Sequence, residues 1–103
     1  MPTFVAKTYI SPRFREAHFE ALKQGGQLPE DIASHVEAHL EYVKDLVARG
    51  KSICNGPTVA FTWGLNVVRA DSLEEAKSII ENDPGMKSGL LTHYEIEPWY
   101  HIN

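Results

Sequence analysis

The chain has 103 residues, of which 43% are apolar and 23% are charged, and its formal net charge is −4. This length supports a single domain over residues 1–103 with one modest core, so a homodimer or a higher homo-oligomer is expected to add buried surface. The scattered Lys and Arg argue against a nucleic-acid binder, which needs a clustered basic face.

The number of cysteines and the length of the apolar runs indicate the cellular compartment in which the protein is expected. The single cysteine, Cys54, excludes a disulfide within the chain and an all-cysteine zinc site. We expect its thiol to be buried and unreactive. No apolar run approaches the roughly 20 residues that span a bilayer, and no charged leader precedes a long apolar region. The sequence therefore predicts a cytoplasmic protein with no membrane partner.

The first half of the chain predicts one strand and two helices. Residues 3–10 are rich in β-branched and aromatic types, which favours a strand. Residues 13–23 have helical periodicity, and glycines follow them. Pro29 begins a longer helix that Gly50 ends. The predicted apolar stripe of this helix consists of Ile32, Val36, Leu40, Val43 and Val47.

The second half predicts two strands, a helix and a final strand. Residues 52–57 form a short strand that Gly-Pro closes, and residues 59–69 form its partner, with large apolar side chains at odd positions. Ser72 and Glu75 have the spacing of a capping box, which starts a helix within residues 71–81. Residues 90–97 form the last strand, with Pro98 at its end.

This order of elements indicates an α+β fold of the ferredoxin-like βαββαβ type. The four-stranded antiparallel sheet should carry both main helices on one face, with an extra helix near residues 13–23. The other face is then bare, and a homodimer that packs sheet on sheet would cover it. The sequence predicts that this bare face is partly polar, with Thr62, Asn66, His93 and Glu95 on it.

Three ordered pieces of sequence resemble the YCII-related (YciI-like) domain family. They are His39-Leu40-Glu41-Tyr42-Val43 leading to Gly56-Pro57, Asp71-Ser72-Leu73-Glu74-Glu75-Ala76 closing at Asp83-Pro84, and Gly89-Leu90 followed by Tyr94-Glu95-Ile96-Glu97-Pro98-Trp99. The resemblance spans about residues 36–99 and, more loosely, the first strand. It implies a ferredoxin-like dimeric α+β barrel.

The family resemblance also implies a characteristic His and Asp, which fall on His39 and Asp83. The implied chemistry is cofactor-independent proton transfer on a small carbonyl, lactone or phenolic compound, by a lyase or an isomerase. Dehydrochlorinases of chlorinated hydroquinones and muconolactone isomerases are similar. The chain departs from the family in its longer segment 13–28, its shorter connection after Pro57, and Gly85 where relatives often carry an aromatic residue. The last two departures alter the predicted pocket wall, so the substrate does not carry over.

His39 and Asp83 each have a structural explanation as well as a catalytic one. His39 lies beside the predicted apolar stripe, where an imidazole can exchange protons near neutral pH or can bind a backbone carbonyl. Asp83 precedes proline and so ends a helix. A carboxylate held in such a turn can also orient an imidazole. The alternative to an enzyme is a non-catalytic small-molecule-binding or assembly module of the same fold.

Other polar and aromatic residues are secondary candidates. His35 and His39 are four residues apart, a spacing that can chelate a metal, but no third ligand accompanies them, so we expect no metal and no cofactor. His18 and His101 are expected on the surface. The predicted substrate-binding residues are Tyr42, Trp63, Asn66 and His93.

Overall fold

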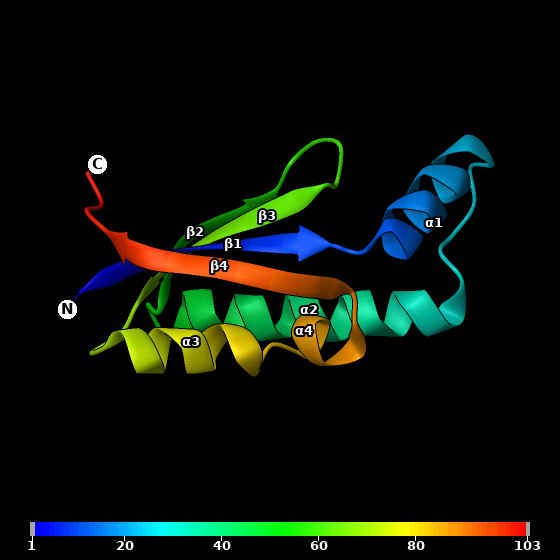
Figure 1. The fold of residues 1–103 in the computed structure, drawn as a ribbon. Coiled ribbons are helices and arrows are strands. Elements are labelled where there is room, and N and C mark those ends of the chain that lie inside the picture. The colour runs from blue at the N-terminus through cyan, green and yellow to red at the C-terminus, as the bar shows by residue number, and fades with distance from the viewer. Residues whose placement is uncertain (1, 103) are drawn as a thin grey trace.

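Four antiparallel strands form one sheet in the order β2–β3–β1–β4 in the computed structural model, which describes residues 2–102. The strands are β1 (Thr3–Ile10), β2 (Ser52–Pro57), β3 (Trp63–Arg69) and β4 (Leu91–Trp99). The helices are α1 (Pro12–Lys23), α2 (Glu30–Ala48), α3 (Leu73–Glu81) and α4 (Pro84–Ser88). Figure 1 shows α2, α3 and α4 below one face of the sheet and α1 beyond one end of it. This arrangement confirms the predicted ferredoxin-like fold.

Serine side chains cap α1 and α3, which begin within two residues of the predicted starts. Ser11 caps α1 by accepting a hydrogen bond from the amide of Phe14, and Ser72 caps α3 by accepting one from the amide of Glu75. Gly50 follows α2 with φ +71°, a conformation that glycine adopts without a steric penalty. In the described part of the chain, no helix is both long and apolar enough to cross a bilayer.

The buried face of α2 differs from the predicted stripe. Leu46 is 1% exposed, whereas Leu40 is 47% exposed and Val47 is 50% exposed. The residues that face the interior are therefore Ile32, Val36, His39, Val43 and Leu46. They follow a 4-3-4-3 spacing, which keeps one line of side chains over the sheet. His39 consequently lies within this line, and the prediction that it lies beside the stripe was wrong.

Two clusters of buried side chains hold the layers together. The larger cluster joins the inner face of the sheet to α3, and it consists of Phe4, Ala6, Val68, Ala70, Ala76 and Ile80. The other joins the end of the sheet to α1 and α2, and it consists of Ile10, Phe14, Ile32, Leu90 and Leu91. Burial of this apolar surface is the main stabilising contribution to the fold.

Two strand boundaries differ from those predicted. β3 begins at Trp63, because Thr58 to Thr62 form a tight loop in which the Phe61 amide donates to the Thr58 carbonyl. Phe61 has φ +55°, which takes it out of the strand conformation. β4 continues through Pro98 to Trp99. It is an edge strand, and an edge tolerates a residue that has no amide hydrogen.

The two faces of the sheet separate residues that the sequence placed together. Asn66 pairs with the buried Ala6 and faces the helices, so its prediction as a residue of the bare face was wrong. His93 stacks on Tyr9 with a ring separation of 4.1 Å, and the Tyr9 hydroxyl donates to Glu95, on the open face. The alternation of side chains along β1 accounts for the separation, since Ala6 and Tyr9 are an odd number of residues apart.

Candidate active site

His39 and Asp83 form a hydrogen-bonded pair across 44 positions of the sequence. Nδ1 of His39 lies 2.8 Å from each carboxylate oxygen of Asp83. The Asp83 residue is buried at 7% exposure, and the imidazole side chain is 25% exposed. A carboxylate only accepts hydrogen bonds, so Nδ1 carries the hydrogen and Nε2 is left as the accepting nitrogen of the neutral ring.

Asp83 is held at the junction of two helices. α3 ends with Asn82 as its cap, and Asp83 is the N-cap of the short helix α4, with Pro84 at its first position. The carboxylate accepts a hydrogen bond of 2.7 Å from the amide of Gly85. The Asp-Pro-Gly stretch therefore both stops α3 and starts α4, and the cap fixes the carboxylate toward α2.

Gly85 leaves the space that the imidazole needs. A Cβ atom at this position would lie 2.9 Å from Nδ1 of His39 and 3.2 Å from Oδ1 of Asp83. Real Cβ atoms do not approach other atoms as closely as 2.9 Å. A side chain at position 85 would therefore displace the imidazole or the carboxylate of the pair.

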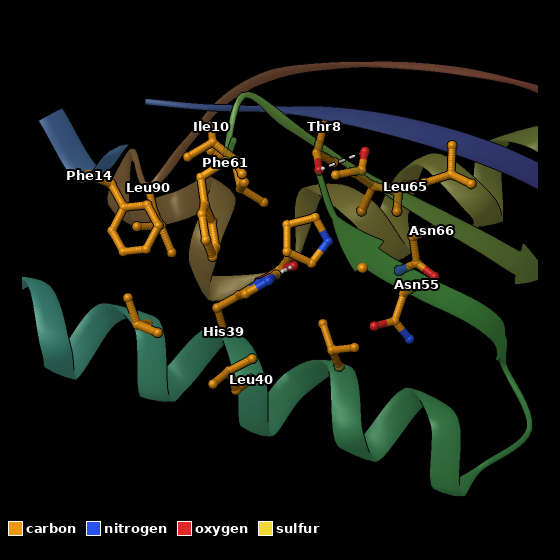
Figure 2. Close-up of a pocket in the computed structure, with 18 residues that line it drawn as sticks. Thr8, Ile10, Phe14, His39, Leu40, Asn55, Phe61, Leu65, Asn66 and Leu90 are labelled. Carbon is orange, nitrogen blue, oxygen red and sulfur yellow. Dashed lines mark hydrogen bonds and ion pairs between the residues drawn. The ribbon is translucent and has the colours of Figure 1, made fainter. Parts of the chain in front are cut away.

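A cavity of about 170 Å³ adjoins the His39–Asp83 pair, between α2 and the inner face of the sheet. Figure 2 shows the side chains that line it. A cavity of roughly 150 Å³ accommodates a benzene ring, so this one accommodates a substituted six-membered ring. The residues that line it are Thr8, Ile10, Phe14, Val36, His39, Leu40, Val43, Asn55, Gly56, Pro57, Phe61, Gly64, Leu65, Asn66, Ile80, Asp83, Leu90 and Leu91.

The two ends of the cavity differ in polarity. Figure 2 shows Ile10, Phe14, Phe61 and Leu90 at one end, with His39 between this group and the opposite end. The opposite end carries the amide side chains of Asn55 and Asn66 and the hydroxyl of Thr8. A ligand would therefore place its apolar part near α1 and its polar part over β2 and β3.

The structure brings three of the six predicted site residues together: His39, Asp83 and Asn66. Tyr42 lies on the α3 side of α2, where its hydroxyl donates to the Ile79 carbonyl at 2.8 Å. Burial, followed by the negative charge of Asp83, raises the pKa of Tyr42 above its ordinary value. Trp63 lies on the open face, under the ammonium group of Lys7, and His93 lies on the same face against Tyr9.

Three residues of the site were not predicted from the sequence: Asn55, Phe61 and Ser52. Asn55 and Phe61 line the cavity, and Ser52 binds the side chains of both Asn55 and Asn66. Phe61 reaches the cavity because its φ of +55° turns the side chain back toward α1, where its ring lies 4.1 Å from that of His18. His18 is therefore half-buried, and its prediction as a surface residue was wrong. The one sequence signal for Asn55 was its position before Gly56-Pro57. This position marks the end of the strand but does not show on which face of the sheet the Asn55 side chain lies.

Cys54 and His35 do not join this site. Cys54 is exposed on the edge strand β2, so the prediction of a buried thiol was wrong. His35 is also exposed, near Arg13 and Gly89. Over residues 2–102, no group of three or more His, Cys, Asp and Glu side chains is placed to hold a metal ion.

Comparison with known proteins gives concordant results. The model of the YCII-related domain family matches residues 12–100. The uncharacterised protein YjpA of Bacillus subtilis (strain 168) is 38% identical over 65 residues, which are 63% of this chain and 75% of YjpA. A solved structure has the same fold with a TM-score of 0.65 and 24% identity, over 96% of this chain and 94% of the other. It is the 5-chloro-2-hydroxyhydroquinone dehydrochlorinase TftG of Burkholderia phenoliruptrix AC1100, in complex with 2,5-dihydroxybenzoquinone.

Proposed function

The chain belongs to the YCII-related domain family, and we propose that it is a cofactor-independent acid–base enzyme of the lyase or isomerase type. Its substrate is a small carbonyl, lactone or phenolic compound. The observation that carries the proposal is the 2.8 Å pair between His39 and Asp83 at the wall of a ring-sized cavity. A histidine oriented by a buried carboxylate beside such a cavity is the arrangement that general base catalysis requires.

The proposed mechanism assigns one role to each member of the pair. Nε2 of His39 accepts a proton from the substrate, because Nδ1 already donates to Asp83. The Asp83 carboxylate fixes the ring orientation and stabilises the imidazolium that forms. The same Nε2 then returns the proton to another atom of the substrate or to its leaving group. His39 is therefore both base and acid, and Asp83 is a positioning residue.

The size and lining of the cavity support a compact, partly apolar substrate. A cavity of about 170 Å³ encloses a compact group, and aromatic side chains at one end favour a planar ring. The dehydrochlorinase TftG, whose fold this chain shares, holds 2,5-dihydroxybenzoquinone, a ring compound of this size with carbonyl and hydroxyl groups. This likeness supports the proposed substrate class.

A non-catalytic role has one observation in its favour. The Asp83 carboxylate also binds the Gly85 amide, so the pair joins α2 to α4 as a structural link would. The two functions predict different behaviour of the same ligand. A binding module holds a compound without exchanging its protons, whereas the enzyme exchanges them.

We further propose that the open face of the sheet packs against a second copy of the chain. This face carries Trp63, Tyr9 and His93, with Lys7 over the first two rings and Glu95 bound to the Tyr9 hydroxyl. Such an aromatic and charged surface suits a self-complementary interface. Sedimentation at micromolar concentration should give the mass of a dimer, and Trp63→Lys should give a monomer. A monomeric wild type at these concentrations refutes this assembly.

Deuterium exchange tests the enzymatic function directly. Carbonyl, lactone and phenolic compounds that raise the melting temperature are incubated with the protein in D2O, and their C–H signals are followed by NMR. We expect the wild type to accelerate exchange and His39→Gln to lose on the order of 10²-fold or more of that acceleration. Ile53→Val, which changes a side chain on β2 outside the cavity lining, is the control. If a ligand binds but its deuterium exchange is equally fast with the wild type and with His39→Gln, the enzymatic function is refuted and the protein is a binding module.

A further inference from the structure

Ser52 joins the two asparagine side chains at the polar end of the cavity. Its hydroxyl oxygen lies 2.7 Å from Oδ1 of Asn66 and 3.2 Å from Nδ2 of Asn55. Ser52 itself is only 5% exposed, so this hydroxyl is shielded from solvent. Asn55 and Asn66 are directly paired across β2 and β3, and both line the cavity.

A β-bulge brings the three residues to one face. The register between β2 and β3 shifts between Ser52 and Cys54. Ser52 and Asn55 are an odd number of residues apart, so a regular strand would point them to opposite faces. The extra residue of the bulge cancels that alternation, and Ser52 therefore lies beside Asn55 on the helix side.

The single hydrogen of the Ser52 hydroxyl restricts what the two amides can present. Ser52 donates to the Asn66 carbonyl oxygen and accepts from the Asn55 amide nitrogen. One asparagine is therefore left with its NH2 group and the other with its C=O group. Within residues 2–102, no protein group bonds Nδ2 of Asn66 or Oδ1 of Asn55. Figure 2 shows both side chains at the cavity end beyond His39. If both amide groups were rotated by half a turn, Asn66 would present its C=O group and Asn55 its NH2 group. The site would still offer one donor beside one acceptor.

We infer that Asn55 and Asn66 recognise a ligand edge on which a carbonyl oxygen stands next to a hydroxyl or N–H group. The carbonyl accepts from one amide, and the neighbouring hydroxyl or N–H donates to the other. This deepens the proposed function, on which it rests for the identity of the cavity as the substrate site. The substrate class is thereby narrowed to vicinal hydroxy-carbonyl compounds and lactams that fit beside His39.

This recognition discriminates because an unmatched ligand leaves a polar group of the site without a partner. A site built to hydrogen-bond a particular group rejects analogues that lack it more strongly than an apolar pocket rejects a change of size. Ser52 contributes by holding the two amides in complementary orientations before the ligand arrives. It is a positioning residue and does not touch the ligand.

Two isomeric probes test the inference: 2-pyridone carries adjacent N–H and C=O groups, and 4-pyridone carries the same groups on opposite sides of the ring. Both are ring-sized and unreactive toward Cys54. NMR titration of the wild type should give roughly tenfold tighter binding of 2-pyridone, the value for about one neutral hydrogen bond, because 4-pyridone can still form one of the two bonds. Equal affinities, or no binding of 2-pyridone, would overturn the inference.

Substitutions test whether the preference for 2-pyridone depends on the amide groups of Asn55 and Asn66. Asn66→Asp and Asn66→Leu should each bring the affinity ratio of the two pyridones close to one, and Ser52→Ala should reduce it. Cys54→Ser changes an exposed neighbour outside the cavity lining and should keep the ratio. Melting curves identify variants that fold. A ratio unchanged in both folded Asn66 variants would overturn the inference.

The same titration separates this inference from the proposed catalysis. His39→Gln should preserve the preference for 2-pyridone, because His39 contributes to neither bond. If His39→Gln leaves deuterium exchange intact while the Asn66 variants lose the preference, the catalytic proposal fails and the recognition stands. If exchange depends on His39 but the pyridones bind equally, the catalytic proposal stands and the recognition fails.

Discussion

A Cβ atom on Gly85 would lie 2.9 Å from Nδ1 of His39. This relationship makes Gly85 part of the geometry of the pair, although it carries no side chain. Replacement by alanine must displace the imidazole, the Asp83 carboxylate or the Leu91 side chain, which lies 3.2 Å from the same position.

We therefore expect Gly85→Ala to lower the free energy of unfolding by about 1–3 kcal/mol, as overpacking of a buried site does. Ligand affinity at the cavity should fall with it. Gly26→Ala is the matched control, because nothing lies within 4 Å of its Cβ position and its φ is not in the left-handed region. Chemical denaturation measures both. A Gly85→Ala protein as stable as the wild type would contradict this packing.

The charge and the cap of Asp83 can be separated by two substitutions. Asp83→Asn retains an oxygen that accepts from the Gly85 amide but removes the negative charge beside His39, whereas Asp83→Ala removes both. We expect the alanine variant to be less stable than the asparagine variant by about 1 kcal/mol, the contribution of a helix cap.

The same variants report on the imidazole tautomer. Nitrogen NMR of the neutral His39 ring should place the hydrogen on Nδ1 in the wild type, because the carboxylate can only accept. Asp83→Asn should shift the population toward the form protonated on Nε2. An identical tautomer in Asp83→Ala would show that Asp83 does not fix the ring.

Leu46 and Val47 are neighbours on α2 with opposite environments. Leu46 is 1% exposed, and Val47 is 50% exposed. Leu46→Ala should lower the free energy of unfolding by about 2–5 kcal/mol through the cavity it leaves, whereas Val47→Ala should change it by about 0.5 kcal/mol or less. Denaturant melts of the two variants measure the contrast. Equal losses would contradict this orientation of α2, and a larger loss in Val47→Ala would mean that α2 presents the face that the sequence predicted.

Tyr42 and Tyr94 make the stability depend on pH at the alkaline end. Burial and then the charge of Asp83 raise the pKa of Tyr42 above 10.0, and burial and then the hydrogen bond to Glu81 raise the pKa of Tyr94 to about 12. The unfolded chain loses these protons first, so their stabilisation is complete below pH 10 and is lost as the pH rises through the folded values.

In Tyr42→Phe, the free energy of unfolding should therefore decrease less steeply above pH 10. In Tyr94→Phe, the decrease should be less steep up to about pH 12. At neutral pH, Tyr42→Phe should cost about 1 kcal/mol, because the hydrogen bond to the Ile79 carbonyl is lost. Urea denaturation across this pH range tests both. A slope unchanged in both variants would assign the alkaline loss to other groups.

Elements whose signals are local could be predicted well from the sequence. The β-branched and aromatic content of β1, the Ser72 cap of α3 and the Gly50 end of α2 are all signals within a few residues. The family resemblance identified His39 and Asp83 as a possible pair. Helical spacing placed the buried face of α2 wrongly, because Leu40, Val43, Leu46 and Val47 offered two apolar lines, and only the sheet above the helix selects one of them.

The amide end of the cavity could not have been predicted in the same way. Ser52 and Asn55 lie on the same face of the sheet because of the bulge between Ser52 and Cys54. This bulge forms when β2 pairs with β3. The wall formed by Phe61 depends on a φ of +55° held by the Thr58–Thr62 loop and by packing on α1. Residue spacing shows neither feature, since the bulge depends on pairing with β3 and the Phe61 wall depends in part on packing against α1.

Local periodicity and residues at fixed spacings were enough to predict the four strands, α1 to α3, the Ser72 cap and the family, whereas the short helix α4 was not predicted. The Asp83 carboxylate faces His39 rather than solvent because of packing between segments that are 44 positions apart in the sequence. At that point α4, whose N-cap is Asp83, packs against α2. The direction of a side chain at a helix junction is set by what packs across from it.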